Sequence, residues 1–552
     1  MRKAGCVVRA VLAAMTALPV LSSAFGGTEY LRMAITARQE GLYALSNEQL
    51  DSFFSAEPNH PNADYALLLY ASNLFELKEY PETKRRLRTL LAQYPNSVYA
   101  KDALGRLALV CLETGDLAEA LEHAVSYRAR YGRDEVVEGQ VTAVVFSRAV
   151  ALFTGGNLGR SEELLKDLRE KFPDCAQKGE VSYYLGLIFY RQNRFDRAAE
   201  FFKEVPDRVS NPAMVADACL KIGDCAFNEG KLADAEAWYR KVVTDYPGFP
   251  LRDAAYLQMG RTLKRMGRYA DAEAGFLRAC DVTTSETVRA VSLDELGRLA
   301  MLQERWDAAE KFFQRIVDDV PSSPQAAEAL LQLGFVNFNA KRYDRAVGFF
   351  QKYLDGGAAG GRPDALFGMG YAYYRNKQVD KATAVWNQLL REFPSSRYTL
   401  EALFILGRKA FEQGQFATAE EKLGRLLRDF PQERFALTSY PFLIESLIEQ
   451  KKYAEAKRVC EEALAKEPTD ELRLLYGKVL AVLKEYAAAE KVLAEIGAEN
   501  PDRKAEALYY LGQVCEATGR PAEARQRYLE IITFYPSAKE WCDLARGKLR
   551  SR

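Results

Sequence analysis

Histidine is almost missing from this chain, which has only His60 and His123 among 552 residues. Neither one has a cysteine or a second histidine at the spacing that metal sites use. A catalytic arrangement built on histidine is equally hard to assemble from two distant residues. We therefore expect no metal, no other cofactor and no enzymatic activity.

Excess charge of either sign is also missing, because 76 basic residues balance 76 acidic ones. Nucleic-acid binding usually needs a basic stripe, so the composition argues against it. The short basic run Lys84-Arg85-Arg86 is interpreted as a solvated helix face. No stretch of the sequence has a β-strand pattern that competes with the helical one.

A phosphate-binding loop is suggested only by the glycine-rich segment 356–361, and the evidence there is incomplete. No strand precedes this segment, and the Lys-Ser/Thr pair that completes such a loop does not follow it. We interpret it as a flexible loop between two repeated units.

A repeat is what the sequence does contain. Glycines recur every 37 residues at Gly186, Gly223, Gly260, Gly297 and Gly334. After one interval that is shorter by one residue, the repeat continues at Gly370 and Gly407. A turn marker follows each glycine nine residues later, as Tyr269 follows Gly260, and an alanine follows three residues after that. Self-similarity at a fixed period of this length is typical of a solenoid of stacked units.

Each unit has the pattern of a helix, a short turn and a second helix. In the unit of Gly260, apolar residues recur at helical spacing up to Leu263. Gly267 is suited to end the first helix in a left-handed turn, and Tyr269 and Ala272 open the second. We expect the two helices to cross closely at the glycine and the alanine. A proline that cannot continue the helix closes many units.

The leucine-glycine or methionine-glycine pairs, the turn aromatics, the alanines and the closing prolines together resemble the tetratricopeptide repeat family. The resemblance implies an all-α, right-handed superhelical solenoid, and we count about fourteen hairpins. The motif Tyr94-Pro-Asn-Ser97 is similar to the envelope subgroup typified by BamD and YbgF. In that family the first helices line an inner groove that binds proteins.

The N-terminus has the pattern of a secretory signal, with a basic start and a short apolar core from Val11 to Leu21. We place the cleavage after Ala24, and we expect a periplasmic protein in which no later segment is apolar enough to span a membrane. Retention of the segment as an anchor is the alternative. Eight cysteines follow it, and we interpret them as buried apolar residues rather than a disulfide framework.

These patterns predict four regions: a signal peptide at 1–24, a degenerate helical hairpin at 25–61, an N-terminal array at 62–355 and a C-terminal array at 362–552. Aromatic residues and arginines gather at groove positions around three of the glycines. We expect a partner-binding strip that consists of Phe335, Asn339, Phe367, Tyr371, Tyr374, Arg375, Arg408 and Phe411. Core packing is the competing interpretation, most of all for Phe411.

The resemblance favours a scaffold that binds extended or helical segments of protein partners. Its expected role is cell-envelope or outer-membrane protein assembly, with peripheral association with outer-membrane complexes. The alternative is an accessory subunit of a complex for polysaccharide export or for peptidoglycan synthesis, hydrolysis or division.

Overall fold

The computed structural model describes residues 26–358 and 360–551, and these residues form α-helices joined by turns, with no strand among them. The predicted signal peptide and its cleavage site lie outside the described residues. The chain divides into two compact units, one up to Thr284 and the other from Ser285. The loop at 356–361 lies inside the second unit, and the division of the array at that loop stays a prediction.

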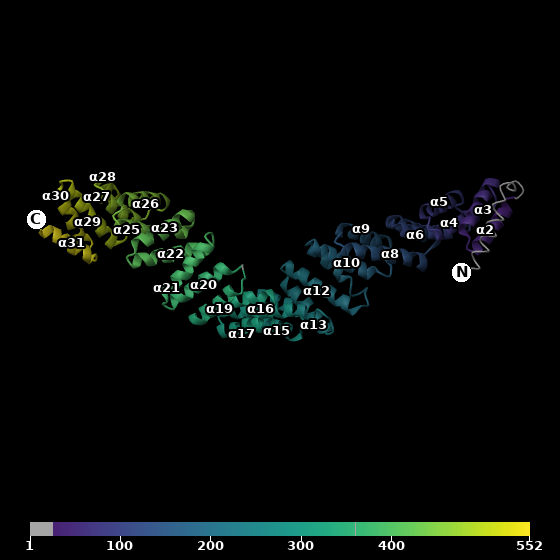
Figure 1. Cartoon of the computed structure of the whole chain (residues 1–552), viewed down its shortest axis with the longest axis horizontal. Coiled ribbons are helices and arrows are strands. Elements are labelled where there is room, and N and C mark those ends of the chain that lie inside the picture. The colour runs from purple at the N-terminus through teal and green to yellow at the C-terminus, as the bar shows by residue number, and fades with distance from the viewer. Residues whose placement is uncertain (1–25, 359, 552) are drawn as a thin grey trace. The chain divides into compact units, whose positions relative to one another are not determined.

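The first unit contains seven helical hairpins (Figure 1). Their helices are α2 (Gly27–Gln39), α3 (Tyr43–Ala56), α4 (Ala63–Glu76), α5 (Tyr80–Gln93), α6 (Ala100–Thr114), α7 (Leu117–Tyr131), α8 (Glu135–Thr154), α9 (Leu158–Lys171), α10 (Lys178–Arg191), α11 (Phe195–Lys203), α12 (Pro212–Asn228), α13 (Leu232–Asp245), α14 (Arg252–Arg265) and α15 (Tyr269–Val282).

The second unit contains seven more hairpins, a short extra helix α24 and a final helix α31. Its helices are α16 (Glu286–Leu302), α17 (Trp306–Asp319), α18 (Pro324–Asn339), α19 (Tyr343–Asp355), α20 (Arg362–Arg375), α21 (Val379–Glu392), α22 (Arg397–Glu412), α23 (Phe416–Asp429), α24 (Arg434–Leu437), α25 (Tyr440–Glu449), α26 (Tyr453–Lys466), α27 (Asp470–Val482), α28 (Tyr486–Ala494), α29 (Pro501–Ala517), α30 (Pro521–Phe534) and α31 (Lys539–Arg550). The described residues thus contain the fourteen hairpins expected from the sequence, and the solenoid fold is confirmed.

The turn markers identified in the sequence are the first residues of the second helices, as Tyr269 is of α15 and Trp306 of α17. The turn before each marker contains a residue with left-handed backbone geometry, and Gly267 has φ of 76° as expected. At the same place in other units the left-handed residue is not glycine, as with Lys341 and Lys377. This conformation is therefore imposed by the hairpin, because lysine does not favour it.

The repeated glycines face a large side chain of their own hairpin, sixteen residues further along the chain. A Cβ added at Gly260 would lie 2.6 Å from ring carbons of Phe276, and one at Gly297 would lie 2.6 Å from Cζ of Phe313. The expectation that the helices cross closely at the glycine and the alanine was therefore only partly correct. The alanines are buried, but the residue one turn beyond each alanine is the one that fills the space beside the glycine.

The size of the second residue depends on that of the first, because aromatic partners occur only beside a glycine, whereas Gly407 and Gly477 pair with leucine. Where alanine replaces the glycine, the partner is leucine or alanine, as in Ala71 with Leu87. Where Ile444 replaces it, the partner is the small Cys460. All these residues are buried: the first-helix positions are Ala34, Ala71, Ala108, Ala149, Gly186, Gly223, Gly260, Gly297, Gly334, Gly370, Gly407, Ile444, Gly477 and Gly512, and the partners are Leu50, Leu87, Ala124, Leu165, Phe202, Tyr239, Phe276, Phe313, Phe350, Trp386, Leu423, Cys460, Leu493 and Tyr528. We call the two residues of one hairpin, the first-helix residue and its partner sixteen residues later, a size pair.

Helix α8 corrects one expectation from the sequence. It is the one helix in the described part of the chain that is long and apolar enough to cross a membrane, and an 18-residue window of it has a mean hydropathy of 1.5. The sequence pattern predicts no such segment after the signal peptide. Of that window, 39% is buried, and α8 packs against α6, α7, α9 and α10 as the first helix of its hairpin.

The cysteines follow the sequence interpretation. The eight cysteines of the described residues are all buried, and burial raises the pKa of the Cys460 thiol to about 12. They act as small apolar side chains of the core.

Replacing Gly297 with alanine should destabilise the hairpin of α16 and α17 by about 1–3 kcal/mol, because the new Cβ would overlap the ring of Phe313. The double variant Gly297→Ala/Phe313→Leu recreates an alanine–leucine size pair and should recover most of this loss. Hydrogen exchange mass spectrometry would measure the protection of both helices.

The exposed helical Gly348, whose Cβ would meet nothing within 4 Å, provides the matched control. Gly348→Ala should stabilise α19 by up to about 1 kcal/mol through helix propensity. If Gly297→Ala gained protection in the same way, the steric account of the repeat would be wrong.

Candidate functional site

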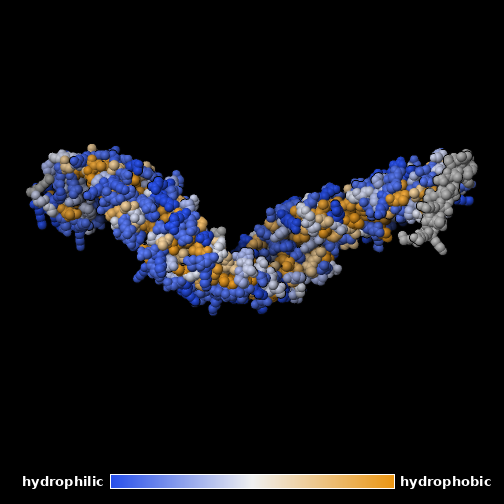
Figure 2. Space-filling view, in the orientation of Figure 1, coloured by the Kyte–Doolittle hydropathy of each residue, from blue (hydrophilic) through white to orange (hydrophobic). Residues whose placement is uncertain are grey.

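A groove in the second unit contains part of the partner-binding strip expected from the sequence. It has a cavity volume of about 900 Å³ and is open to solvent. Helices α20 and α22 and the segment after α23 form it, and its lining residues are Tyr371, Tyr374, Ser395, Arg397, Leu400, Glu401, Phe404, Ile405, Arg408, Lys409, Glu412, Phe430 and Glu433. We call it the aromatic groove. Figure 2 shows hydrophobic residues scattered among hydrophilic ones on the visible face of both units.

Two tyrosines on consecutive turns of α20 give the groove its apolar floor. The ring centroids of Tyr371 and Tyr374 lie 6.2 and 5.8 Å from that of the buried Trp386. Trp386 is itself the size partner of Gly370. Both tyrosines are half-buried, so each packs on the core with one side and lines the groove with the other.

Charged side chains form the walls of the aromatic groove. Arg408 donates to Glu412 over 3.0 Å, and Lys409 lies 3.6 Å from the same carboxylate. Tyr398 lies beside Arg397 and donates a hydrogen bond to Asp364. The pKa of Tyr398 is raised, mainly by burial and also by this hydrogen bond. The groove thus joins aromatic rings to charges of both signs, which is the composition that anchors protein interfaces.

The structure brings together three of the eight residues predicted for the strip, namely Tyr371, Tyr374 and Arg408. The others lie outside the cavity. Phe335 packs edge-on against Phe350, with centroids 5.1 Å apart; Asn339 is exposed; Phe367 stacks on Tyr398 at 4.9 Å; Arg375 is exposed beside Tyr343; and Phe411 packs against Phe442 at 5.5 Å.

Sequence reasoning missed several lining residues, among them Leu400, Ile405 and Phe430. Leu400 and Ile405 precede Gly407 in the sequence of α22. They are not at the positions, counted from the glycine, at which groove residues were expected. Phe430 follows α23 and enters the groove only through the folded hairpin. Its signal in the sequence is the Phe-Pro pair that closes the unit.

A second, smaller cavity of about 340 Å³ is lined mainly by residues of α27 and α29. Tyr453, Tyr486 and Tyr510 line it together with Lys478. Lys478 lies 5.2 Å from the centroid of the Tyr510 ring and forms an ion pair with Glu506. The same combination of aromatic rings and charge therefore recurs along this unit.

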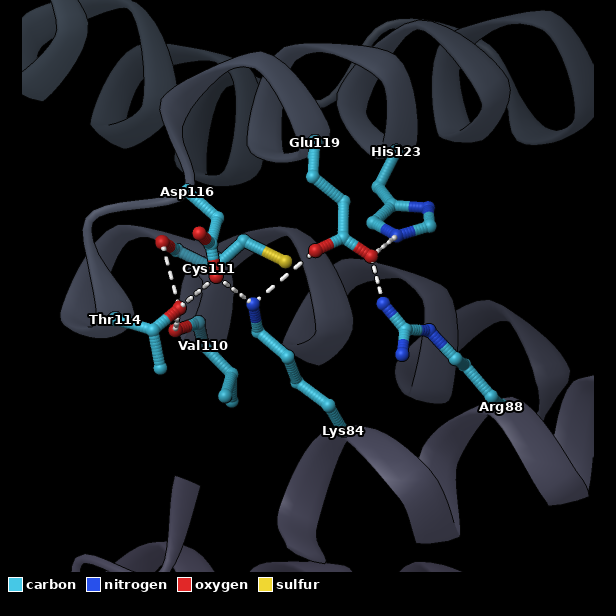
Figure 3. A network of polar contacts seen from close by, with 8 residues as sticks. All are labelled: Lys84, Arg88, Val110, Cys111, Thr114, Asp116, Glu119 and His123. Carbon is cyan, nitrogen blue, oxygen red and sulfur yellow. Dashed lines mark hydrogen bonds and ion pairs between the residues drawn. The ribbon is translucent and has the colours of Figure 1, made fainter. Parts of the chain in front are cut away.

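The first unit contains a different feature, a network of charges around the buried Lys84 (Figure 3). Lys84 extends from α5 and donates to Asp116 and Glu119, and Arg88 also binds Glu119. The sequence interpretation of Lys84 as part of a solvated helix face was wrong, since 6% of the residue is exposed. The network joins the second hairpin to the third.

The network also brings His123 near a cysteine, which the spacing in the sequence did not indicate. Ligand atoms of Cys111, Glu119 and His123 lie within 4.8 Å of one another. Two cationic groups already fill this place, because Lys84 and Arg88 both donate to Glu119 (Figure 3). Burial raises the pKa of Cys111 to about 11. A protonated thiol beside two cations opposes metal binding.

The pKa of Glu119 reflects these partners. Burial alone would raise it, but hydrogen bonds from Arg88, Lys84, Cys111 and His123 outweigh burial and lower it to about 2. The carboxylate therefore contributes stability above about pH 4.5, its ordinary value, and loses this contribution as the pH falls through about 2.

Comparisons with known proteins agree with the fold and the repeat. Models described as tetratricopeptide repeat match residues 146–213, 210–250, 257–324, 295–363, 364–396, 401–433, 447–508 and 497–539, which together span more than half of the chain. The chain therefore belongs to the tetratricopeptide repeat family. A model described as outer membrane lipoprotein matches residues 29–120. No curated protein matches this chain.

Several solved structures are similar to this chain. The C-terminal part of a repeat-containing protein from Cytophaga hutchinsonii is 18% identical, with 47% of this chain and 98% of that one covered and a TM-score of 0.40. The pilF protein of Pseudomonas aeruginosa is 18% identical, with coverage of 40% and 94% and a TM-score of 0.31. A Naa15/Naa10 structure bound to HypK-THB is 14% identical, with coverage of 95% and 78% and a TM-score of 0.35.

Replacing Glu119 with glutamine should destabilise α5 to α7 by about 1–3 kcal/mol at pH 7, because Lys84 and Arg88 lose a charged acceptor. The difference from the natural protein should shrink as the pH falls towards 2. Urea titration followed by hydrogen exchange mass spectrometry would measure it at pH 7 and pH 3.

Glu122→Gln is the matched control, because Glu122 is an exposed glutamate on the same helix. It should leave stability unchanged at both pH values. A cost for Glu119→Gln that was equal at pH 7 and pH 3 would show that its charge does not stabilise the network.

Proposed function

We propose that this protein is an exported envelope scaffold whose aromatic groove binds a segment of a partner protein. As a member of the tetratricopeptide repeat family, it is built for protein–protein interaction. The single observation that carries the proposal is the open cavity of about 900 Å³ in which Tyr371 and Tyr374 meet charged side chains.

The construction of the groove supports binding by a preformed surface. The buried ring of Trp386 packs against the rings of both tyrosines. The Trp386 ring is itself packed against Gly370, its partner in the size pair. Side chains held in this way lose little conformational entropy when a partner binds, so more of the contact energy becomes affinity. Aromatic residues and arginine are also the residues that dominate binding energy at interfaces.

The N-terminal match supports a place in the cell envelope. Residues 29–120 resemble the outer membrane lipoprotein family, and they extend from α2 into α7. We propose that the mature protein lies in the periplasm, associates peripherally with outer-membrane complexes and acts in the assembly of outer-membrane or other envelope proteins. Its role is to hold partners, with no chemistry of its own.

The double variant Tyr371→Ala/Tyr374→Ala tests the groove. A photoreactive amino acid at position 405, on the groove wall, would form crosslinks to envelope proteins in cells, and mass spectrometry would identify them. We expect the double variant to reduce these crosslinks at least tenfold, because it removes two aromatic anchors of about 1 kcal/mol or more each.

Tyr373→Ala is the matched control for stability, because Tyr373 is a half-buried tyrosine of α20 that does not line the groove. It should keep the crosslinks. If Tyr373→Ala abolished them equally, or if position 405 formed none in the natural protein, the groove would not be the binding site. Crosslinks to cytoplasmic proteins alone would contradict the envelope role.

A further inference from the structure

The seam between the hairpin of α20 and α21 and the hairpin of α22 and α23 is loosely packed. Helix α21 packs less closely against α22 than any other second helix of the second unit packs against the first helix of the next hairpin. The aromatic groove of about 900 Å³ lies along this seam, because Tyr371 and Tyr374 come from one side of it and Arg408 comes from the other. The groove therefore lies where the stack of this unit is least filled.

Elsewhere in the second unit, an ion pair ties consecutive hairpins together at the turn edge, which is the edge of the stack that contains the turns within the hairpins. The pair joins the residue directly before one turn marker to the residue four places after the preceding turn marker. The N···O distances are between 2.5 and 2.7 Å, and the pairs are Arg342 with Glu310, Lys452 with Glu420, Glu485 with Lys457 and Arg520 with Glu490. We call these two positions the junction pair.

The junction pair at the seam of the groove is uncharged. It consists of Thr383 in α21 and Gln415 before α23, which cannot form an ion pair. The junction pair between α19 and α21 is also uncharged, but there Asn376 donates to Asp344 over 2.7 Å at the turn edge. Among the described residues, no hydrogen bond or ion pair crosses the turn edge at the seam of the groove.

The opposite edge of this seam, which contains the loops between hairpins, is held by several contacts. Tyr398 of α22 donates to Asp364 of α20, and its ring stacks on that of Phe367 with centroids 4.9 Å apart. Arg425 of α23 donates to the main-chain oxygen of Leu390 in α21 over 3.3 Å. Because contacts hold one edge and not the other, rotation about the held edge is the easiest relative motion of the two hairpins.

Each side of the groove stays intact during such a rotation. Tyr371 and Tyr374 pack against Trp386 of their own hairpin, and Arg408 binds Glu412 of its own helix. Rotation therefore changes the distance between the two walls and leaves the arrangement within each wall as it is.

We propose that these two hairpins form a joint, which opens at the turn edge to admit the partner segment and then closes on it. A segment in the groove would fill the seam and supply the packing that the seam lacks, so binding favours the closed position. This inference rests on the proposed function and concerns the regulation of the same groove.

Distance measurements by electron paramagnetic resonance on the full-length protein test the joint. Spin-labelled amino acids replace Gly348 and Glu421, two exposed residues on either side of the seam. The matched control replaces Glu421 and the exposed Lys491, which are separated by two junctions with charged junction pairs. We expect the distribution of distances between positions 348 and 421 to be at least about 1.5-fold broader than that of the control.

A charged junction pair placed at the seam should lock the joint. Thr383→Glu/Gln415→Arg copies the pair of Glu310 and Arg342, and it should narrow the distribution between positions 348 and 421 to the width of the control. In cells, it should reduce the crosslinks from position 405 at least about threefold, because the turn edge then opens less often. Gln415→Arg alone adds the charge without the pair and should change neither measurement.

Equal widths at the seam and in the control, or a width that the double variant does not change, would overturn the joint and leave the groove as a binding site. A narrowed distribution with unchanged crosslinks would show that binding does not need the motion, and this would also overturn the proposal. Absence of crosslinks from position 405 in the natural protein would contradict the proposed function itself, and with it the role of the joint.

Discussion

The size pair is the interaction on which the rest of this structure depends. Each hairpin closes because a small residue of the first helix leaves room for a larger one of the second helix, sixteen residues later. The pair is buried in the fourteen hairpins of the described residues, and its aromatic partners occur only opposite glycine. Close packing explains this, because a core has neither space for an extra methyl group nor tolerance for a missing one.

The same constraint explains where a binding surface can form. The size pairs occupy the interior of each hairpin, so the inner face of the first helices is free to vary. In α20 and α22 it varies towards tyrosine, phenylalanine and arginine. Trp386 connects the two roles, because it fills the space beside Gly370 and supports the rings of Tyr371 and Tyr374. Packing and recognition thus share one side chain.

Local signals in the sequence predicted the positions of the hairpins closely. They did not predict contacts between residues that are distant in the sequence. Turn markers such as Tyr269 begin their helices because turn and helix geometry depend on neighbouring residues. The partner of each glycine was missed because its distance of sixteen residues spans the turn. Lys84 was misplaced for the same reason, since its acidic partners lie on another hairpin. Of the predicted strip, Phe335 and Phe411 pack against the rings of Phe350 and Phe442 and do not line the cavity.

Transferring a size pair between hairpins tests the central claim most directly. Gly297→Ile/Phe313→Cys would place the pair of Ile444 and Cys460 in the hairpin of α16 and α17. Hydrogen exchange of these helices in the double variant and in both single variants is the deciding measurement. The account predicts that each single change strongly reduces protection, while the double variant regains most of it. Losses that simply add would contradict the account.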